Sequence, residues 1–136
     1  MSANLDLVRW IYAAWTRGDF SSMAWAHPDI EYVVVDFVEP ISRVGSDATA
    51  QAIQGIYGEW EAPRIECDEI RPLDDGRVLV LNHLAGRGKA SGIDVGHMRR
   101  NGAAILSFRD GRVVRYLSYF DRDRALADLG LAREVD

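Results

Sequence analysis

The chain has 136 residues, of which 48% are hydrophobic and 27% charged, and its formal net charge at pH 7 is −5. A chain of this length forms one domain with a core and room for a modest internal cavity. The acidic balance argues against non-specific binding to nucleic acid, because such binding depends on clustered cations that neutralise phosphates. We therefore predict a single domain over residues 1–136 that binds no nucleic acid.

Membrane and export signals are missing from the sequence. The longest apolar run, residues 10–15, is much shorter than the ~18 residues that a membrane-spanning helix requires. The first ten residues contain no basic segment followed by an apolar one, so no secretory signal is visible. The single cysteine, Cys67, excludes an internal disulfide and a thiolate zinc cluster. These features predict a cytoplasmic protein with no membrane partner.

The N-terminal half is predicted to contain helices around one strand. Apolar spacing indicates a helix over residues 4–17, which Gly18 ends as a C-terminal cap. Asp19 then begins a second, short helix through Trp25. Residues 30–38 are rich in β-branched and aromatic side chains and predict a strand, and a third helix follows from Ser46 to Trp60.

After residue 63 the apolar pattern has a period of two, which is typical of strands. The strand candidates are residues 64–71, 77–87, a stretch within 93–109, and 112–120. The dipeptides Asp75-Gly76 and Asp110-Gly111 favour tight hairpins, which join antiparallel neighbours. A last short helix starts at Asp121. The pattern predicts an α+β fold, with a largely antiparallel sheet and helices packed on one of its faces.

Several segments resemble the SnoaL-like branch of the NTF2-like superfamily. They are Arg17-Gly18-Asp19-Phe20, His27-Pro28-Asp29-Ile30, the turn GRGKASG and the closing segment FRDGRVVRYLSYFDRDRALADLGL. The resemblance covers nearly the whole chain and implies a cone, in which a curved sheet wraps around N-terminal helices and encloses a cavity. The superfamily includes ketosteroid isomerases, limonene epoxide hydrolases, polyketide cyclases and non-enzymatic binding domains. The resemblance therefore implies the fold more strongly than the reaction.

Asp36 is the first candidate for a catalytic residue. The segment YVVVDFVEPISRVG is similar, without a gap, to the ketosteroid-isomerase segment whose strand ends at the catalytic base, and that base falls on Asp36. Asp36 also interrupts an apolar run, and a carboxylate desolvated by such neighbours suits a general acid or base near neutral pH. The alternative is an Asp at a strand end that hydrogen-bonds the next loop or faces water.

Two other positions depart from the isomerase pattern. Aligned on Gly18-Asp19, the oxyanion-hole tyrosine of the first helix falls on Ile11, with Tyr12 one position away. The oxyanion acid falls on Ala104. Such donors typically supply a few kcal/mol each to a developing enolate. The resemblance therefore does not imply a steroid isomerase.

His83 is the second candidate for acid–base chemistry. It neighbours Asn82 in a predicted strand, so one of the two side chains faces the cavity and the other faces outward. The pattern does not decide between them. Histidine carries protons near neutral pH, whereas the alternative for His83 is a structural or exposed side chain.

A ligand-binding wall is predicted from aromatic residues and from one face of the last strand. On that strand Tyr116 could donate a hydrogen bond to a ligand, or it could fill the core and bond a backbone carbonyl. The predicted wall consists of Trp15, Tyr32, Trp60, Tyr116, Ser118 and Phe120.

Motifs for metals and cofactors are incomplete. The three histidines and one cysteine show no metal-ligand spacing. Gly86 and Gly88 are followed by Ser91 where a dinucleotide-binding loop needs its third glycine. We expect no cofactor and no metal.

These observations leave two hypotheses for function. The first is a SnoaL-like domain that binds a small apolar ligand, as a cofactor-independent isomerase, cyclase or hydrolase that uses Asp36 as acid or base on an oxygen-bearing substrate. The second is a non-catalytic ligand-binding or accessory dimerisation domain. Convergent polar groups in the cavity, Asp36 among them, favour the enzyme, and an entirely apolar or filled cavity favours the second hypothesis.

A homodimer is the predicted assembly. The outward-facing residues of the last strand are predicted to be Val113, Arg115, Leu117 and Tyr119, a mixture typical of interfaces. If the helices close the other side of the sheet, no helix covers this face. A two-fold dimer would bury it with the same patch on both partners.

Overall fold

The computed structural model describes residues 3–36, 39–57, 60–73, 75–88 and 100–130, without the side chains of residues 60–62, 86–88 and 100. The elements follow the chain in the order α1 (Ala3–Thr16), β1 (Ala26–Val34), β2 (Ile41–Val44), α2 (Ser46–Tyr57), β3 (Trp60–Pro72), β4 (Val78–Gly88), β5 (Arg100–Arg109), β6 (Arg112–Tyr119) and α3 (Arg122–Asp128). Within these ranges no helix is long and apolar enough to cross a membrane.

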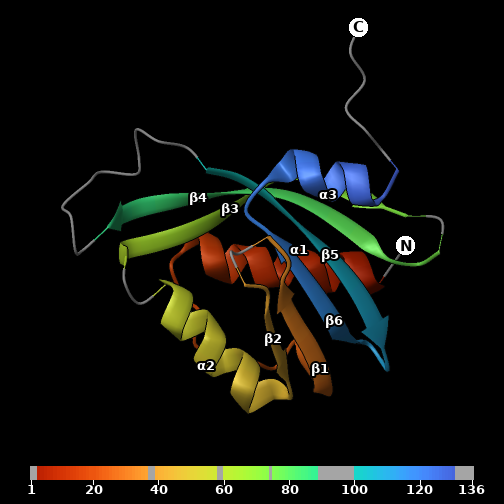
Figure 1. Cartoon of the computed structure of the whole chain (residues 1–136). Coiled ribbons are helices and arrows are strands. Elements are labelled where there is room, and N and C mark those ends of the chain that lie inside the picture. Colours follow the sequence, from red (N-terminus) through yellow and green to blue (C-terminus); the bar gives the residue numbers. More distant parts are fainter. Residues whose placement is uncertain (1–2, 37–38, 58–59, 74, 89–99, 131–136) are drawn as a thin grey trace, which may run out of the picture.

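The strands form one curved sheet in the order β2-β1-β6-β5-β4-β3 (Figure 1). All neighbours are antiparallel except β1 and β6, which pair in parallel. The hairpin between β5 and β6 turns at Asp110 and Gly111, both at positive φ, as the dipeptide predicts. The α+β prediction is confirmed, and the antiparallel succession holds for β3 to β6.

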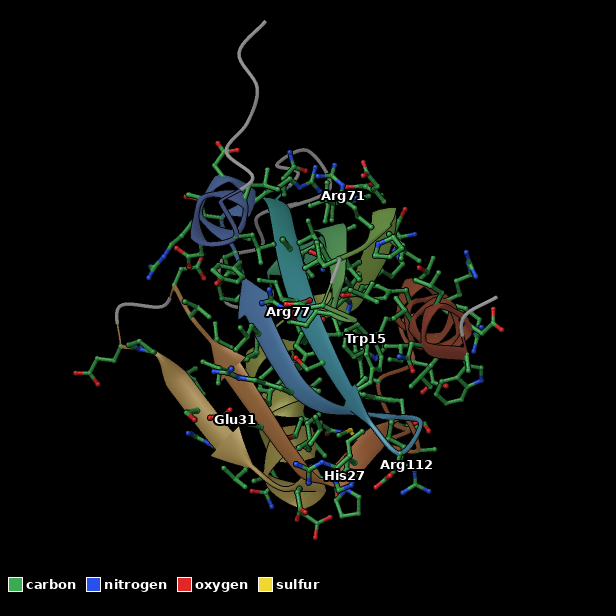
Figure 2. All side chains as sticks on the ribbon, turned by 90° about the vertical axis from the view of Figure 1, so that its right-hand side faces the viewer. Trp15, His27, Glu31, Arg71, Arg77 and Arg112 are labelled. Atoms are coloured by element: carbon green, nitrogen blue, oxygen red, sulfur yellow. The ribbon has the colours of Figure 1, made fainter. Side chains whose placement is uncertain are left out.

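The main core lies between the sheet and the helices α1 and α2. The helical spacing of Val8, Ile11, Tyr12 and Trp15 places all four side chains on the buried face of α1. The label of Trp15, a residue of α1, lies between the helix and the sheet in Figure 2. Gly18 ends the helix at a φ of +79°, as predicted. The side of the sheet that faces α1 is called the inner face below.

α3 packs on the opposite, outer face of the sheet (Figure 1). Asp121 caps the helix by accepting a hydrogen bond from the backbone N–H of Asp123. Under the helix lies a second apolar cluster, formed by Leu79, Leu81, Ala103, Ile105, Tyr119 and Ala125. The prediction that every helix lies on one face is therefore wrong. The apolar side chains of this short helix indicate that it packs against the sheet, but they do not indicate on which face of the sheet.

A β-bulge reverses the expected orientation of Val113. Phe108 pairs with Val113 and Ser107 pairs with Arg115, so Val114 is an extra residue on β6. Val113 is consequently buried in the inner core, with 0% of its surface exposed, and its predicted outward position is wrong. Beyond the bulge, Leu117 and Tyr119 do lie on the outer face, where they belong to the cluster under α3.

The segment between α1 and β1 also differs from the prediction. Residues 19–25 form no helix, because the Asp19 carboxylate accepts hydrogen bonds from the backbone N–H and the hydroxyl of Ser21 and closes a local turn instead. β1 begins earlier than predicted, at Ala26, and ends at Val34. The short edge strand β2 was not predicted, and α2 ends at Tyr57, before Trp60.

Candidate functional site

A cavity lies on the inner face of the sheet, beside the ends of β4, β5 and β6. Its enclosed part measures about 20 Å³, and the hollow reaches about 360 Å³ when the space open to solvent is included. The enclosed part has room for about one water, whereas ligand pockets begin near ~300 Å³. The lining includes Tyr57, Asn82, Gly102, Tyr116, Ser118 and Phe120.

Three side chains form a hydrogen-bond chain beside this cavity, which we call the relay. The side-chain amide of Asn82 donates to the Tyr12 hydroxyl at 3.0 Å, and the Tyr12 and Tyr116 hydroxyls lie 2.8 Å apart. The alternation of β4 turns Asn82 inward together with Val80 and Leu84. The relay thus joins α1, β4 and β6 in the core.

One arrangement of the relay protons leaves a donor for the cavity. Asn82 donates to the Tyr12 oxygen, and either tyrosine hydroxyl can donate to the other. When Tyr12 donates to Tyr116, the Tyr116 proton is available for an acceptor in the cavity, which Tyr116 lines. In this arrangement Tyr116 is the end of the relay that a ligand oxygen could meet.

Burial keeps the relay hydroxyls protonated. It raises the pKa of Tyr12 well above the ordinary value, and the hydrogen bonds from Tyr116 and Asn82 offset only part of this rise. Burial also raises the pKa of Tyr116, and the neighbouring Tyr12 raises it further. Near neutral pH both groups are therefore uncharged donors, and neither is a base.

The predicted wall residues lie at different depths. Tyr116, Ser118 and Phe120 line the cavity. Tyr32 is buried behind them, stacked on Tyr116 with ring centroids 5.5 Å apart, and it shares a side-chain hydrogen bond with Ser118. Trp15 is also buried, with its ring 5.9 Å from that of Tyr116. The side chain of Trp60 lies outside the described residues.

Gly102 allows the close approach of three strands at the cavity. A Cβ atom at this position would lie 2.5 Å from the Tyr119 carbonyl oxygen and 3.0 Å from Oδ1 of Asn82. Any larger residue would push β6 or the Asn82 amide aside. The absence of a side chain here is therefore a condition for the relay geometry.

Asp36 holds the corner between β6 and α3. Its two carboxylate oxygens accept hydrogen bonds from the backbone N–H groups of Phe120, at 2.9 Å, and Asp121, at 2.8 Å. This is the hydrogen-bonded loop contact that the sequence offered as the alternative to catalysis. Asp36 is not among the residues that line the cavity, although Phe120 is.

His83 lies on the outer face of the sheet. Its Nδ1 atom is 2.9 Å from Oδ1 of Asp68, and its Nε2 atom is 3.6 Å from Oε1 of Glu66. Asn82, rather than His83, faces the cavity. His83 therefore does not reach the relay. No contact of His83 with the cavity supports its predicted catalytic role.

The sequence did not single out Tyr12, Tyr57, Asn82 or Gly102 as site residues. The family alignment placed the oxyanion-hole tyrosine on Ile11. In the structure, the neighbouring residue Tyr12 contributes a hydroxyl to the relay. The helical period contained this signal, because Val8, Tyr12 and Trp15 share one face. In the described ranges, no group of three His, Cys, Asp or Glu side chains could hold a metal ion.

A curved sheet that packs against α1 and has a cavity with polar side chains on the same face is typical of the NTF2-like fold. The profile of the SnoaL-like domain matches residues 8–116, and the chain belongs to this family. No curated protein matches the chain.

Solved structures share the fold across most of the chain. An NTF2-like protein of unknown function from Burkholderia pseudomallei is 22% identical, with a TM-score of 0.74, and the match covers 93% of this chain and 97% of that one. An LEH-like epoxide hydrolase from M. tuberculosis is 21% identical, with a TM-score of 0.66 and coverage of 88% and 83%. A protein with a ketosteroid isomerase-like fold from Catenulispora acidiphila, in complex with trimethylamine, is 17% identical, with a TM-score of 0.71 and coverage of 93% of both chains.

Proposed function

We propose that the protein binds a small apolar molecule through an oxygen atom that accepts a hydrogen bond from Tyr116. It would act on this molecule as a cofactor-independent isomerase, cyclase or hydrolase. The observation that carries the proposal is the relay, which ends at the cavity with a protonated hydroxyl. The names of two structural neighbours, an LEH-like epoxide hydrolase and a protein with a ketosteroid isomerase-like fold, are in keeping with this class of reaction.

The chemistry of the relay favours an oxygen that gains negative charge. Preorganised uncharged donors bind an anionic oxygen more strongly than a neutral carbonyl, because a hydrogen bond to a charged acceptor is the stronger one. When Tyr12 donates to Tyr116, Asn82 and Tyr12 polarise the Tyr116 hydroxyl, because each then donates to the next group. An enolate or alkoxide formed during reaction would be stabilised in this way. Asp36, beside the Phe120 wall, is the proposed acid or base.

Replacing Tyr116 by Phe tests the proposal, because it removes the hydroxyl and keeps the ring. We expect wild-type protein to bind 4-nitrophenol more tightly than phenol, since a much larger fraction of the more acidic 4-nitrophenol is ionised near neutral pH and presents an anionic oxygen. Tyr116→Phe should lower the affinity for 4-nitrophenol by roughly tenfold, the scale of one hydrogen bond to a charged group. Isothermal titration calorimetry measures both affinities.

Tyr119→Phe is the matched control on the same strand. Tyr119 is also among the residues that line the cavity, but it belongs to the outer apolar cluster and its hydroxyl donates to Asp128 at 2.8 Å rather than to the relay. This variant should bind both phenols as the wild-type protein does. Equal affinity losses in the two variants, or no loss in Tyr116→Phe, would contradict the proposed role of the relay.

A second candidate function is a non-catalytic ligand-binding or accessory domain. It is favoured by the position of Asp36, whose two oxygens already accept backbone hydrogen bonds and which does not line the cavity. In that case the phenols bind with the same dependence on Tyr116, and no bound ketone or epoxide is converted. Product analysis after incubation with such compounds separates the two functions.

We also propose that the protein forms a homodimer, on a smaller surface than the sequence predicted. α3 packs on β5 and on the end of β6, over a cluster that includes Leu79 and Leu81 of β4, which leaves β1 and the rest of β6. There Arg115, with 53% of its side chain exposed, pairs with Glu31 at 3.1 Å. Light scattering should give about twice the chain mass of 15.2 kDa at micromolar concentration. A mass near that of one chain contradicts the dimer.

A further inference from the structure

Arg122 connects α3 to the strands that carry the cavity lining. Its Nη2 atom donates hydrogen bonds to the backbone carbonyl of Asn82 and to Oδ2 of Asp68, both at 2.7 Å. Its Nε atom donates to the carbonyl of Gly102 at 3.1 Å. The side chain is 22% exposed, so it is largely enclosed by these partners.

The two carbonyls belong to opposite residues of β4 and β5. Asn82 and Gly102 face each other in the sheet, and both line the cavity on the inner face. Arg122 reaches the same two residues from α3, which packs on the outer face. The guanidinium group therefore fixes, from behind the sheet, the backbone from which the Asn82 amide projects into the relay.

Asp68 holds the guanidinium group in place. It occupies a β-bulge of β3, where Cys67 pairs with Asn82 and Glu69 pairs with Leu81. One carboxylate oxygen of Asp68 accepts from Arg122, and the other lies 2.9 Å from Nδ1 of His83. A planar guanidinium can bond several oxygens in fixed directions at once, which the ammonium of a lysine cannot do in the same geometry.

We propose that Arg122 is a positioning residue, which sets the orientation of the Asn82 amide toward Tyr12 and thereby directs the Tyr116 hydroxyl into the cavity. Arg122 touches no ligand in this scheme and acts through the backbone of Asn82 and Gly102. The effect on ligand binding rests on the proposed function of the relay. The effect on Asn82 itself does not.

Arg122→Ala and Arg122→Lys test the proposal, with Arg124→Ala as the matched control on the same helix. Arg124 is 51% exposed, and its guanidinium lies 4.0 Å from the Asp128 carboxylate. The first readout is the pair of side-chain amide signals of Asn82 in a ¹H–¹⁵N spectrum of the full chain. The second readout is the affinity for 4-nitrophenol.

We expect both Arg122 variants to shift the Asn82 amide signals and to lower the affinity for 4-nitrophenol by roughly tenfold, the scale of one hydrogen bond to a charged group. Arg124→Ala should change neither. Lysine should fail to restore the signals, because it keeps the charge beside Asp68 and loses the bonds to both carbonyls. If Arg122→Ala does not fold, Arg122→Lys alone decides the matter.

Unchanged Asn82 signals in a folded Arg122 variant would overturn the inference. So would a loss of thermal stability with unchanged signals and affinity, because that is what a purely structural residue gives. If wild-type protein binds no phenol, the proposed function fails. The Asn82 signals still decide the role of Arg122 in that case.

Discussion

Raising the pH above 10 should unfold this protein steeply, within about two pH units. Burial raises the pKa of Tyr12, Tyr32, Tyr57 and Tyr116 above the ordinary value of 10.0. In the unfolded chain the same four groups ionise near their ordinary value. The unfolded state therefore loses protons that the folded state still holds.

The sign of the effect follows from this difference. A group whose pKa is raised by folding contributes its full stability below the unfolded pKa, and that stability is lost as the pH rises toward the folded pKa. Ionisation of each such tyrosine in the unfolded chain lowers the free energy of unfolding by about 1.4 kcal/mol per pH unit above 10, so four together give roughly 5.6 kcal/mol per unit. Two units then remove about 11 kcal/mol, which is sufficient for a domain whose stability lies in the lower two thirds of the usual range of about 5–15 kcal/mol.

Absorbance at 295 nm and circular dichroism during an alkaline titration measure the two events. Tyrosinate absorbance should rise together with loss of the fold, whereas in guanidinium chloride it should rise near pH 10. Tyr119, whose pKa is raised to about 12, adds to the late rise. Tyr12→Phe should make the transition shallower. Ionisation of the buried tyrosines near pH 10 in a folded protein would contradict their burial.

The sequence was sufficient to predict the elements with strong local signals. The apolar spacing of α1, the Asp110-Gly111 turn and the cap Asp121 each depend on residues close in the chain, and each is where it was predicted. The failures arise where distant contacts decide. The bulge at Val114 reverses Val113, and a 7-residue helix such as α3 does not indicate which face of the sheet it covers.

The candidate site shows the same division. Alternation on β6 predicted that Tyr116 and Ser118 share one face, and the resemblance directed this face toward the cavity; in the structure both residues line the cavity. The relay was not predicted, because Asn82 and Tyr12 are 70 residues apart and meet only through the packing of α1 against the sheet. Likewise, the choice between Asn82 and His83 depends on the register of β4, which no local pattern fixes.

Asp36→Asn should lower the free energy of unfolding by about 2–3 kcal/mol, the scale of a lost hydrogen bond to a charged group. The two carboxylate oxygens accept from the N–H groups of Phe120 and Asp121. An asparagine keeps one acceptor, but its NH₂ group would face the second N–H, donor against donor. A loss of activity in Asp36→Asn would therefore not by itself identify a catalytic group, because the substitution also disturbs these contacts.

Chemical denaturation of wild type, Asp36→Asn and Asp29→Asn measures this effect. Asp29 is the control, because its side chain is 75% exposed and its ion pair with His27 spans 3.9 Å. Asp29→Asn should stay within about 0.5 kcal/mol of wild type, as surface substitutions usually do. If Asp36→Asn is equally stable, the contacts to Phe120 and Asp121 contribute little, and the carboxylate is free to serve as an acid or base. A destabilised variant that still turns over a substrate would exclude that chemistry and leave Asp36 as the residue that holds the Phe120 wall in place.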